Sequence, residues 1–135
     1  MKNRRQFLKE SSALGAASFL APSIYAGTAA GASELEVGVL FSLSGGLAMI
    51  EKSLSDATLM AIDEINAAGG VNGMMIKPIL EDGASDPKTY NEKASKLVIR
   101  DRVPTVFGSY TSASRKAVLP VFEKRNNMYL SLIHI

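Results

Sequence analysis

Hydrophobic and polar positions alternate in blocks along the chain, and the first such block predicts a buried strand. The run from Leu35 to Phe41 is apolar, and a loop rich in serine and glycine follows it from Ser42 to Gly46. Short apolar runs bounded by turn residues are typical of strands buried in a parallel sheet. This block therefore predicts the first strand and the loop that leaves it.

The second block has the period of an amphipathic helix, with charged residues such as Glu51 between its apolar positions. The apolar residues recur at steps of three or four: Ile50, Leu54, Ala57, Ala61 and Ile65. This spacing places them on one helix face, which we expect to be buried. The pair Gly69 and Gly70 is expected to end the helix.

A second strand and helix follow. The segment from Met74 to Asp82 predicts a strand at a sheet edge, because Pro78 cannot donate to a sheet ladder. Asp86 is suited to cap the next helix, and Pro87 suits its first position. The buried stripe of that helix is expected at four positions: Tyr90, Ala94, Leu97 and Val98.

The third unit is a strand from Thr105 to Gly108 and a helix that carries apolar residues from Ala117 onward. Pro120 lies inside this helix. An interior proline removes a hydrogen bond and clashes with the preceding turn, so we expect a kink or a break there. Met128 and Tyr129 then begin a fourth strand.

Alternating strands and helices predict an α/β fold with a flavodoxin-like parallel sheet. With the proline-bearing second strand at the edge, the expected strand order is 2-1-3-4. The carboxyl ends of strands one and three then adjoin, so the loops at Ser42–Gly46 and Ser109–Ser114 are expected to face one crevice. Neither loop contains a phosphate-binding fingerprint.

Composition and charge exclude several functions. The net charge is +2, but from Ser33 onward there are 11 basic and 12 acidic residues, which gives −1 and no basic face for nucleic acid. The chain has no cysteine, and its one histidine, His134, is the penultimate residue. Thiolate chemistry, disulfides and a histidine-based triad or zinc site therefore have no basis. We expect no catalytic residue, no metal site and no cofactor.

Residues 1–32 read as a cleavable export signal. The paired Arg4 and Arg5 resemble the twin-arginine signal, which is an address read by the twin-arginine translocase. Cleavage after Ala32 fits the small-x-small rule better than cleavage after Ala26. The following small-residue stretch is interrupted by serine and proline, so it does not predict a membrane anchor.

The turn after the third strand, Gly108 to Lys116, is the first candidate for a site. Small hydroxyl residues stand where a buried strand passes into a helix, whose first N–H groups have no intrahelical partner. Two interpretations stay open for Ser112: it caps the helix, or it contacts a ligand.

Four stretches of the sequence carry a family resemblance. They are Gly38–Gly45, Ala61–Gly73, Glu81–Asp86 and Tyr110–Pro120. Together they resemble the type I periplasmic substrate-binding proteins of ABC importers, in the branch that binds urea and short-chain amides. The resemblance implies two α/β lobes that close on one ligand, delivery to permease subunits in the inner membrane, and a periplasmic location.

By the same resemblance, Tyr110, Thr111 and Ser112 match ligand-contacting positions, with Ser44 and Gly45 as weaker matches. Hydroxyl groups, helix N–H groups and an aromatic wall satisfy a neutral amide without any charge. The chain is then a binding protein and not an enzyme, and residues 33–129 are the N-terminal part of lobe one. We interpret residues 130–135, which resemble a translated sequencing adapter, as an artefactual tail of a fragment.

Alternatives are a branched-chain amino acid binder of the same superfamily, an amide-sensing regulator, and an exported flavodoxin-like enzyme. A regulator would act in the cytoplasm, which the export signal argues against. An enzyme needs a reactive constellation, and the acidic residues Glu81, Asp82 and Asp86 are explained by a helix cap and a solvated strand end.

Overall fold

A computed structural model describes residues 34–132. Residues 1–32, which we interpret as an export signal, lie outside the described part of the chain. The elements follow in the order β1 (Glu34–Phe41), α2 (Ala48–Ala67), β2 (Met75–Asp82), α3 (Pro87–Ser95), the π-helical turn η1 (Lys96–Arg100), β3 (Thr105–Gly108), α4 (Ser112–Arg125) and β4 (Met128–Ser131).

The four strands form one parallel sheet in the order β2-β1-β3-β4, as the sequence predicts. Gly38 of β1 pairs in register with Val106 of β3 and with Ile79 of β2. Strand β2, which contains Pro78, lies at one edge, and β4 lies at the other. Strand β4 includes Leu130 and Ser131.

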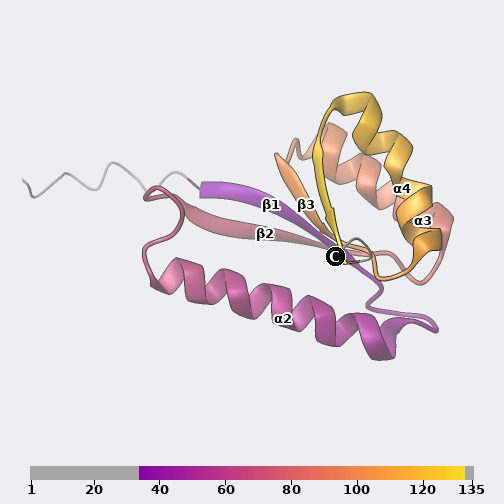
Figure 1. Ribbon diagram of the computed structural model, residues 1–135, viewed down its shortest axis with the longest axis horizontal. Coiled ribbons are helices and arrows are strands. Elements are labelled where there is room, and N and C mark those ends of the chain that lie inside the picture. The colour runs from indigo at the N-terminus through magenta and orange to yellow at the C-terminus, as the bar shows by residue number, and fades with distance from the viewer. Residues whose placement is uncertain (1–33, 133–135) are drawn as a thin grey trace, which may run out of the picture. The chain divides into compact units, whose positions relative to one another are not determined.

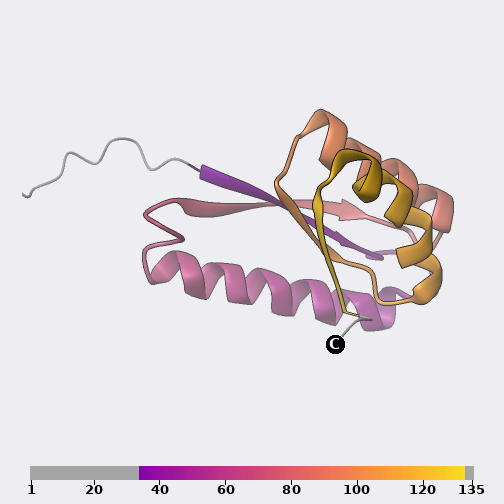
Figure 2. The ribbon, with the colours of Figure 1, turned by 45° about the horizontal axis from the view of Figure 1, so that its top comes forward.

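The helices cover both faces of the sheet. Helix α2 runs along one face, while α3 and α4 pack together on the other (Figures 1 and 2). Strand β1 is buried from Val37 onward on both sides. This explains why the sequence of β1 is a continuous apolar run: a strand that is covered on both faces has no polar side.

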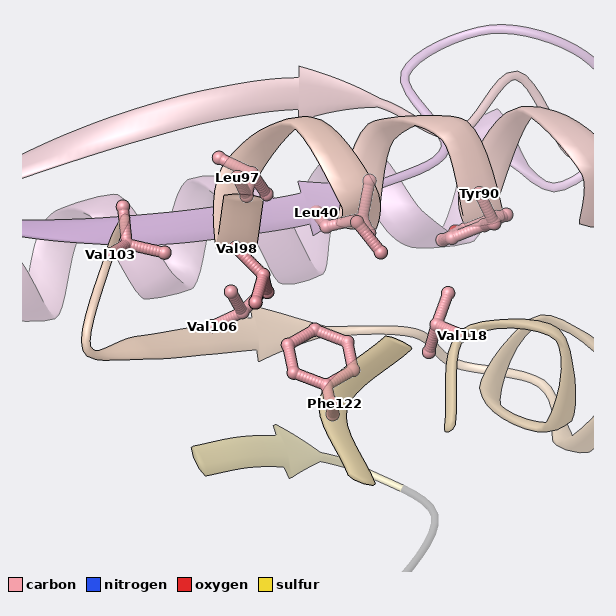
Figure 3. Close-up of a cluster of buried hydrophobic side chains, with 9 residues drawn as sticks. Leu40, Tyr90, Leu97, Val98, Val103, Val106, Val118 and Phe122 are labelled. Carbon is pink, nitrogen blue, oxygen red and sulfur yellow. The ribbon is translucent and has the colours of Figure 1, made fainter. Parts of the chain in front are cut away.

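Most of the buried side chains lie between the sheet and the pair α3 and α4. In Figure 3, Leu40 and Val106 come from the sheet, and Tyr90 and Phe122 come from the helices that cover it. The predicted stripe is confirmed, since Tyr90 and Ala94 of α3 and Leu97 and Val98 of η1 are all buried. A second, smaller cluster on the α2 face consists of Val37, Val39, Phe41 and Ile62.

The predicted buried face of α2 is wrong. Four of its five positions are exposed and Leu54 is only partly buried, whereas Glu51, which was expected to be polar surface, is buried together with Ser55 and Ile62. The apolar stripe instead lies beside a groove of about 590 Å³. This apolar groove is lined by Leu35, Val37, Leu54, Ala57, Thr58, Ala61, Ile62, Ile65, Val71, Ile76, Thr105, Phe107 and Leu132.

The predicted cap of α3 is confirmed, whereas the predicted break in α4 is not. Asp86 caps α3 by accepting from the N–H of Thr89 at 2.8 Å, with Pro87 in the first position as expected. Helix α4 continues through Pro120 without the expected break. No helix within residues 34–132 has the length and apolar character needed to cross a membrane.

The end of α2 is tied to the outer edge of β2. The side-chain amide of Asn66 donates to the carbonyl oxygen of Ile76 at 2.8 Å, and its oxygen accepts from the N–H of Ile76 at 2.7 Å. One asparagine thus pairs with both backbone groups of an edge residue.

Candidate functional site

Three loops meet at the carboxyl ends of the parallel strands and form a cleft of about 590 Å³. The loops follow β1, β2 and β3. The cleft is lined by Gly46, Leu47, Ser85, Pro87, Tyr90, Thr111, Ala113 and Ser114. The crevice predicted between the first and third loops therefore exists, and the second loop contributes to it as well.

The third loop turns sharply from β3 into α4. Ser109 is fully buried with φ +61°, and its N–H donates to the carbonyl oxygen of Leu40 at 3.1 Å. Thr111 is the N-cap of α4: its hydroxyl oxygen accepts from the N–H of Ser114 at 3.2 Å. The Thr111 and Ser114 hydroxyls are 2.6 Å apart. Thr111 thus both caps the helix and lines the cleft.

The interpretation of Ser112 as the helix cap is wrong. Ser112 is the first residue of α4 and is exposed, since Thr111 before it has the extended backbone that a cap requires. Its hydroxyl is therefore free of the capping role. Tyr110 is 44% exposed. Of the three predicted residues, Thr111 lines the cleft, and Tyr110 and Ser112 flank it in sequence.

The first loop is held by the second. The Ser44 hydroxyl donates to Oδ2 of Asp82 at 2.7 Å, and the Ser85 hydroxyl donates to the Ser44 carbonyl oxygen at 2.8 Å. Gly45 has φ +80°, and a Cβ there would lie 2.7 Å from the Ser85 hydroxyl oxygen. Ser44 and Gly45 therefore shape the loop, while the next two residues, Gly46 and Leu47, line the cleft.

Asp82 organises both loops with one carboxylate. Its Oδ1 accepts from the N–H groups of Leu43 at 2.7 Å, Ala84 at 2.8 Å and Ser44 at 3.3 Å. Burial alone would raise the pKa of Asp82, but these bonds and the one from the Ser44 hydroxyl stabilise the charged form and lower the pKa below 3.8. The folded loops thus favour the ionised carboxylate of Asp82.

The other acidic residues of this region have separate roles. Glu81 is buried and pairs with Lys96 and, at 2.8 Å, with Lys93, so the expectation of a solvated strand end is wrong for it. Asp86 is the α3 cap. Within residues 34–132, no three acidic or histidine side chains gather in a way that could hold a metal ion.

Sequence reasoning missed Glu51. This residue of α2 is fully buried beneath the first loop, and its Oε2 accepts from the N–H of Ser42 at 2.6 Å and from the Tyr90 hydroxyl. Burial, and then the bond to Glu51, raise the pKa of the Tyr90 hydroxyl, so this hydroxyl stays a donor. Periodicity gave no signal for Glu51, because it stands among charged residues on a polar part of the helix pattern.

These features define the class of the domain: it is a doubly wound parallel α/β domain with its cleft at the carboxyl ends of the strands. Residues 35–133 match the family described as periplasmic binding protein domain. The chain belongs to this family.

Two groups of relatives support the assignment. The Leu/Ile/Val-binding protein homolog 8 of Brucella suis biovar 1 (strain 1330) is 36% identical over 119 residues, which cover 82% of this chain and 29% of the relative. The Leu/Ile/Val-binding protein homolog 7 of Brucella abortus (strain 2308) is 30% identical over 110 residues, covering 82% and 27%. The chain spans less than a third of the length of these relatives.

Solved structures agree. The branched-chain amino acid transporter substrate binding protein LivJ from Streptococcus pneumoniae, in complex with isoleucine, superposes with a TM-score of 0.72 at 29% identity, covering 73% of this chain and 28% of LivJ. A putative branched-chain amino acid ABC transporter from Rhodospirillum rubrum gives 0.69 at 28% identity, covering 73% and 28%. These comparisons give no support to the narrower expectation of a urea and amide branch.

Proposed function

We propose that this chain forms the first part of the N-terminal lobe of an extracytoplasmic substrate-binding component of an ABC importer. The component would capture a small ligand in the periplasm and deliver it to permease subunits in the inner membrane. Membership of the periplasmic binding protein family supports this role and favours binding over catalysis. Export through the twin-arginine translocase remains a prediction from Arg4 and Arg5.

The start of α4 at the cleft is the observation that carries the proposal. A helix N-terminus offers N–H groups and a partial positive charge to an oxygen of a ligand. Thr111 satisfies the N–H of Ser114, and Ser112, the first residue of the helix, is exposed. These groups suit a carboxylate or a carbonyl oxygen. Tyr110 would supply the neighbouring aromatic wall, and Ser44 and Gly45 the shape of the opposite rim.

An aliphatic amino acid is the ligand that the relatives favour. The two Brucella proteins are named for leucine, isoleucine and valine, and LivJ is in complex with isoleucine. The carboxylate of such a ligand would meet the start of α4, where negative charge is stabilised.

Urea or a short-chain amide is the second candidate, and one observation favours it. None of the eight residues that line the cleft carries a charge. A neutral ligand with a carbonyl acceptor and N–H donors needs no charged partner, and hydroxyl and backbone groups can satisfy it.

Calorimetric titration of the complete gene product distinguishes these candidates. We expect saturable binding of one class in a panel of leucine, isoleucine, valine, urea and acetamide. We further expect Ser112→Ala to weaken that binding at least tenfold, because it removes a hydroxyl at the helix start. Ser53→Ala, which changes an exposed serine of α2, is the matched control and should bind as the wild type does. Absence of binding across the panel would refute the proposal for these ligands.

A further inference from the structure

We propose that Glu51 is the positioning residue of the cleft: it holds the first loop, the second loop and the Tyr90 ring in the arrangement that receives the ligand. The inference rests on the proposed function and deepens it. Glu51 touches no ligand in this scheme and acts through the residues that line the cleft.

The carboxylate of Glu51 is buried and contacts two other segments directly. Glu51 is fully buried, although its neighbours Ile50 and Lys52 are exposed. Its Oε2 accepts from the backbone of Ser42, at the start of the first loop, and from the hydroxyl of Tyr90, in α3. One oxygen atom thus joins the first loop, α2 and α3.

The hydrogen bonds continue from Ser42 and Tyr90 to the surface of the cleft. The Ser42 hydroxyl lies 2.9 Å from the Tyr90 hydroxyl and accepts from the N–H of Ser85 at 3.1 Å. The Ser85 hydroxyl oxygen accepts from the N–H of Leu47 at 3.0 Å. Tyr90, Ser85 and Leu47 all line the cleft. The carboxylate is therefore connected to three lining residues from both loops and from α3.

Stability alone does not explain a carboxylate at this position. Burying a carboxylate costs free energy, and an apolar side chain of similar size often stabilises a core as well or better. Within the described residues, Oε1 of Glu51 has no hydrogen-bond partner, so the group is not even fully compensated. The carboxylate is explained if it serves as a shared acceptor for the N–H of Ser42 and the hydroxyl of Tyr90, since directional hydrogen bonds fix the relative position of the first loop and α3.

The test compares variants of the complete gene product that remain folded. Glu51→Ala removes the acceptor, whereas Glu51→Gln keeps an oxygen for both donors. Leu97→Ala is the matched control, because Leu97 is equally buried in the core beside α3 and makes no hydrogen bond through its side chain. Each variant is titrated with isoleucine and with acetamide, well below its melting temperature, and its backbone amide exchange is followed by NMR.

We expect Glu51→Ala to weaken binding at least tenfold and to accelerate amide exchange at Ser42, Leu47 and Ser85. Glu51→Gln should restore affinity to within about threefold of the wild type, because the amide oxygen of glutamine can still accept from the N–H of Ser42 and from the Tyr90 hydroxyl. Leu97→Ala should lower the melting temperature and leave affinity and the exchange of these three amides unchanged.

Two results would overturn the proposal. In the first, Glu51→Ala binds within threefold of the wild type and its loop amides exchange at the wild-type rate. In the second, Leu97→Ala loses as much affinity as Glu51→Ala, so that binding follows stability alone. If the wild type binds neither probe, the proposed function fails for these two ligands. The exchange data still decide the role of Glu51: acceleration confined to the three amides supports it, and unchanged or uniform exchange contradicts it.

Discussion

Among the glycines of residues 34–132, Gly108 leaves the least room for an added methyl group. It ends β3 and precedes the turn that leads to the cleft. A Cβ at Gly108 would lie 1.9 Å from the carbonyl oxygen of Leu40 in β1, whereas real Cβ atoms essentially never approach another atom closer than 3.0 Å. Gly108→Ala therefore requires β1 and β3 to separate by more than an ångström at this point.

The cost follows from what this separation breaks. Forcing a methyl group into a packed interior costs about 1–3 kcal/mol, and the upper end applies because the obstacle is backbone and cannot rotate away. The hydrogen bond from the N–H of Ser109 to the oxygen of Leu40 would be lost as well, which adds about 1 kcal/mol. We expect Gly108→Ala to lower the free energy of unfolding by about 4 kcal/mol.

Urea unfolding followed by circular dichroism measures this difference. Gly46→Ala is the control, since a Cβ there meets no atom within 4 Å. Its free energy of unfolding should stay unchanged or rise by at most about 1 kcal/mol. A loss below about 1 kcal/mol for Gly108→Ala would show that the strands move apart freely, and the account of the tight β1 and β3 contact would be wrong.

Three further predictions concern the loops, the cap and the groove. Asp82→Asn should lower the free energy of unfolding at pH 7 by about 2 kcal/mol. Because the pKa of Asp82 is lowered on folding, the stabilisation that its carboxylate provides is complete above pH 3.8 and disappears as the pH falls through the folded-state pKa. The difference in unfolding free energy between the variant and the wild type should therefore shrink at low pH. A constant difference from pH 7 to pH 3 would argue against this role of Asp82. Thr111→Ala should cost about 1 kcal/mol and Ser112→Ala less than about 0.5 kcal/mol in thermal unfolding, and the reverse order would return the capping role to Ser112. Residues 33–135 expressed alone should self-associate in light scattering, because the apolar groove beside α2 stays open; a monodisperse, cooperatively melting sample would contradict this.

The sheet was predictable because its signals are local. Pro78 places its strand at an edge, and apolar runs followed by turns mark the other strands. The α3 cap at Asp86 and its stripe from Tyr90 were predictable for the same reason, since the capping residue and the period both lie within one short segment. Strand order then followed from edge and alternation alone.

The site was predictable only to the level of its loops. Which of Thr111 and Ser112 caps α4 depends on one backbone torsion, and both residue types are suited to the role. Glu51 depends on tertiary contacts with Ser42 and Tyr90, which lie 9 and 39 positions away. The spacing of apolar residues identifies the apolar face of a helix, but it cannot predict that a charged side chain such as Glu51 is buried as a hydrogen-bond acceptor.

The asparagine at the end of α2 has a consequence for the growth of the sheet. Ile76 turns its backbone groups away from β1 and toward Asn66, and by the alternation of a parallel ladder Pro78, two residues on, faces the same way with no N–H to offer. Two successive outward positions of β2 are thus closed to another strand. At Ile76 the side-chain amide of Asn66 already occupies the N–H and the carbonyl oxygen, and at Pro78 there is no N–H to donate. Pairing of a further strand, whether from this chain or from a second copy, is therefore disfavoured along this part of β2.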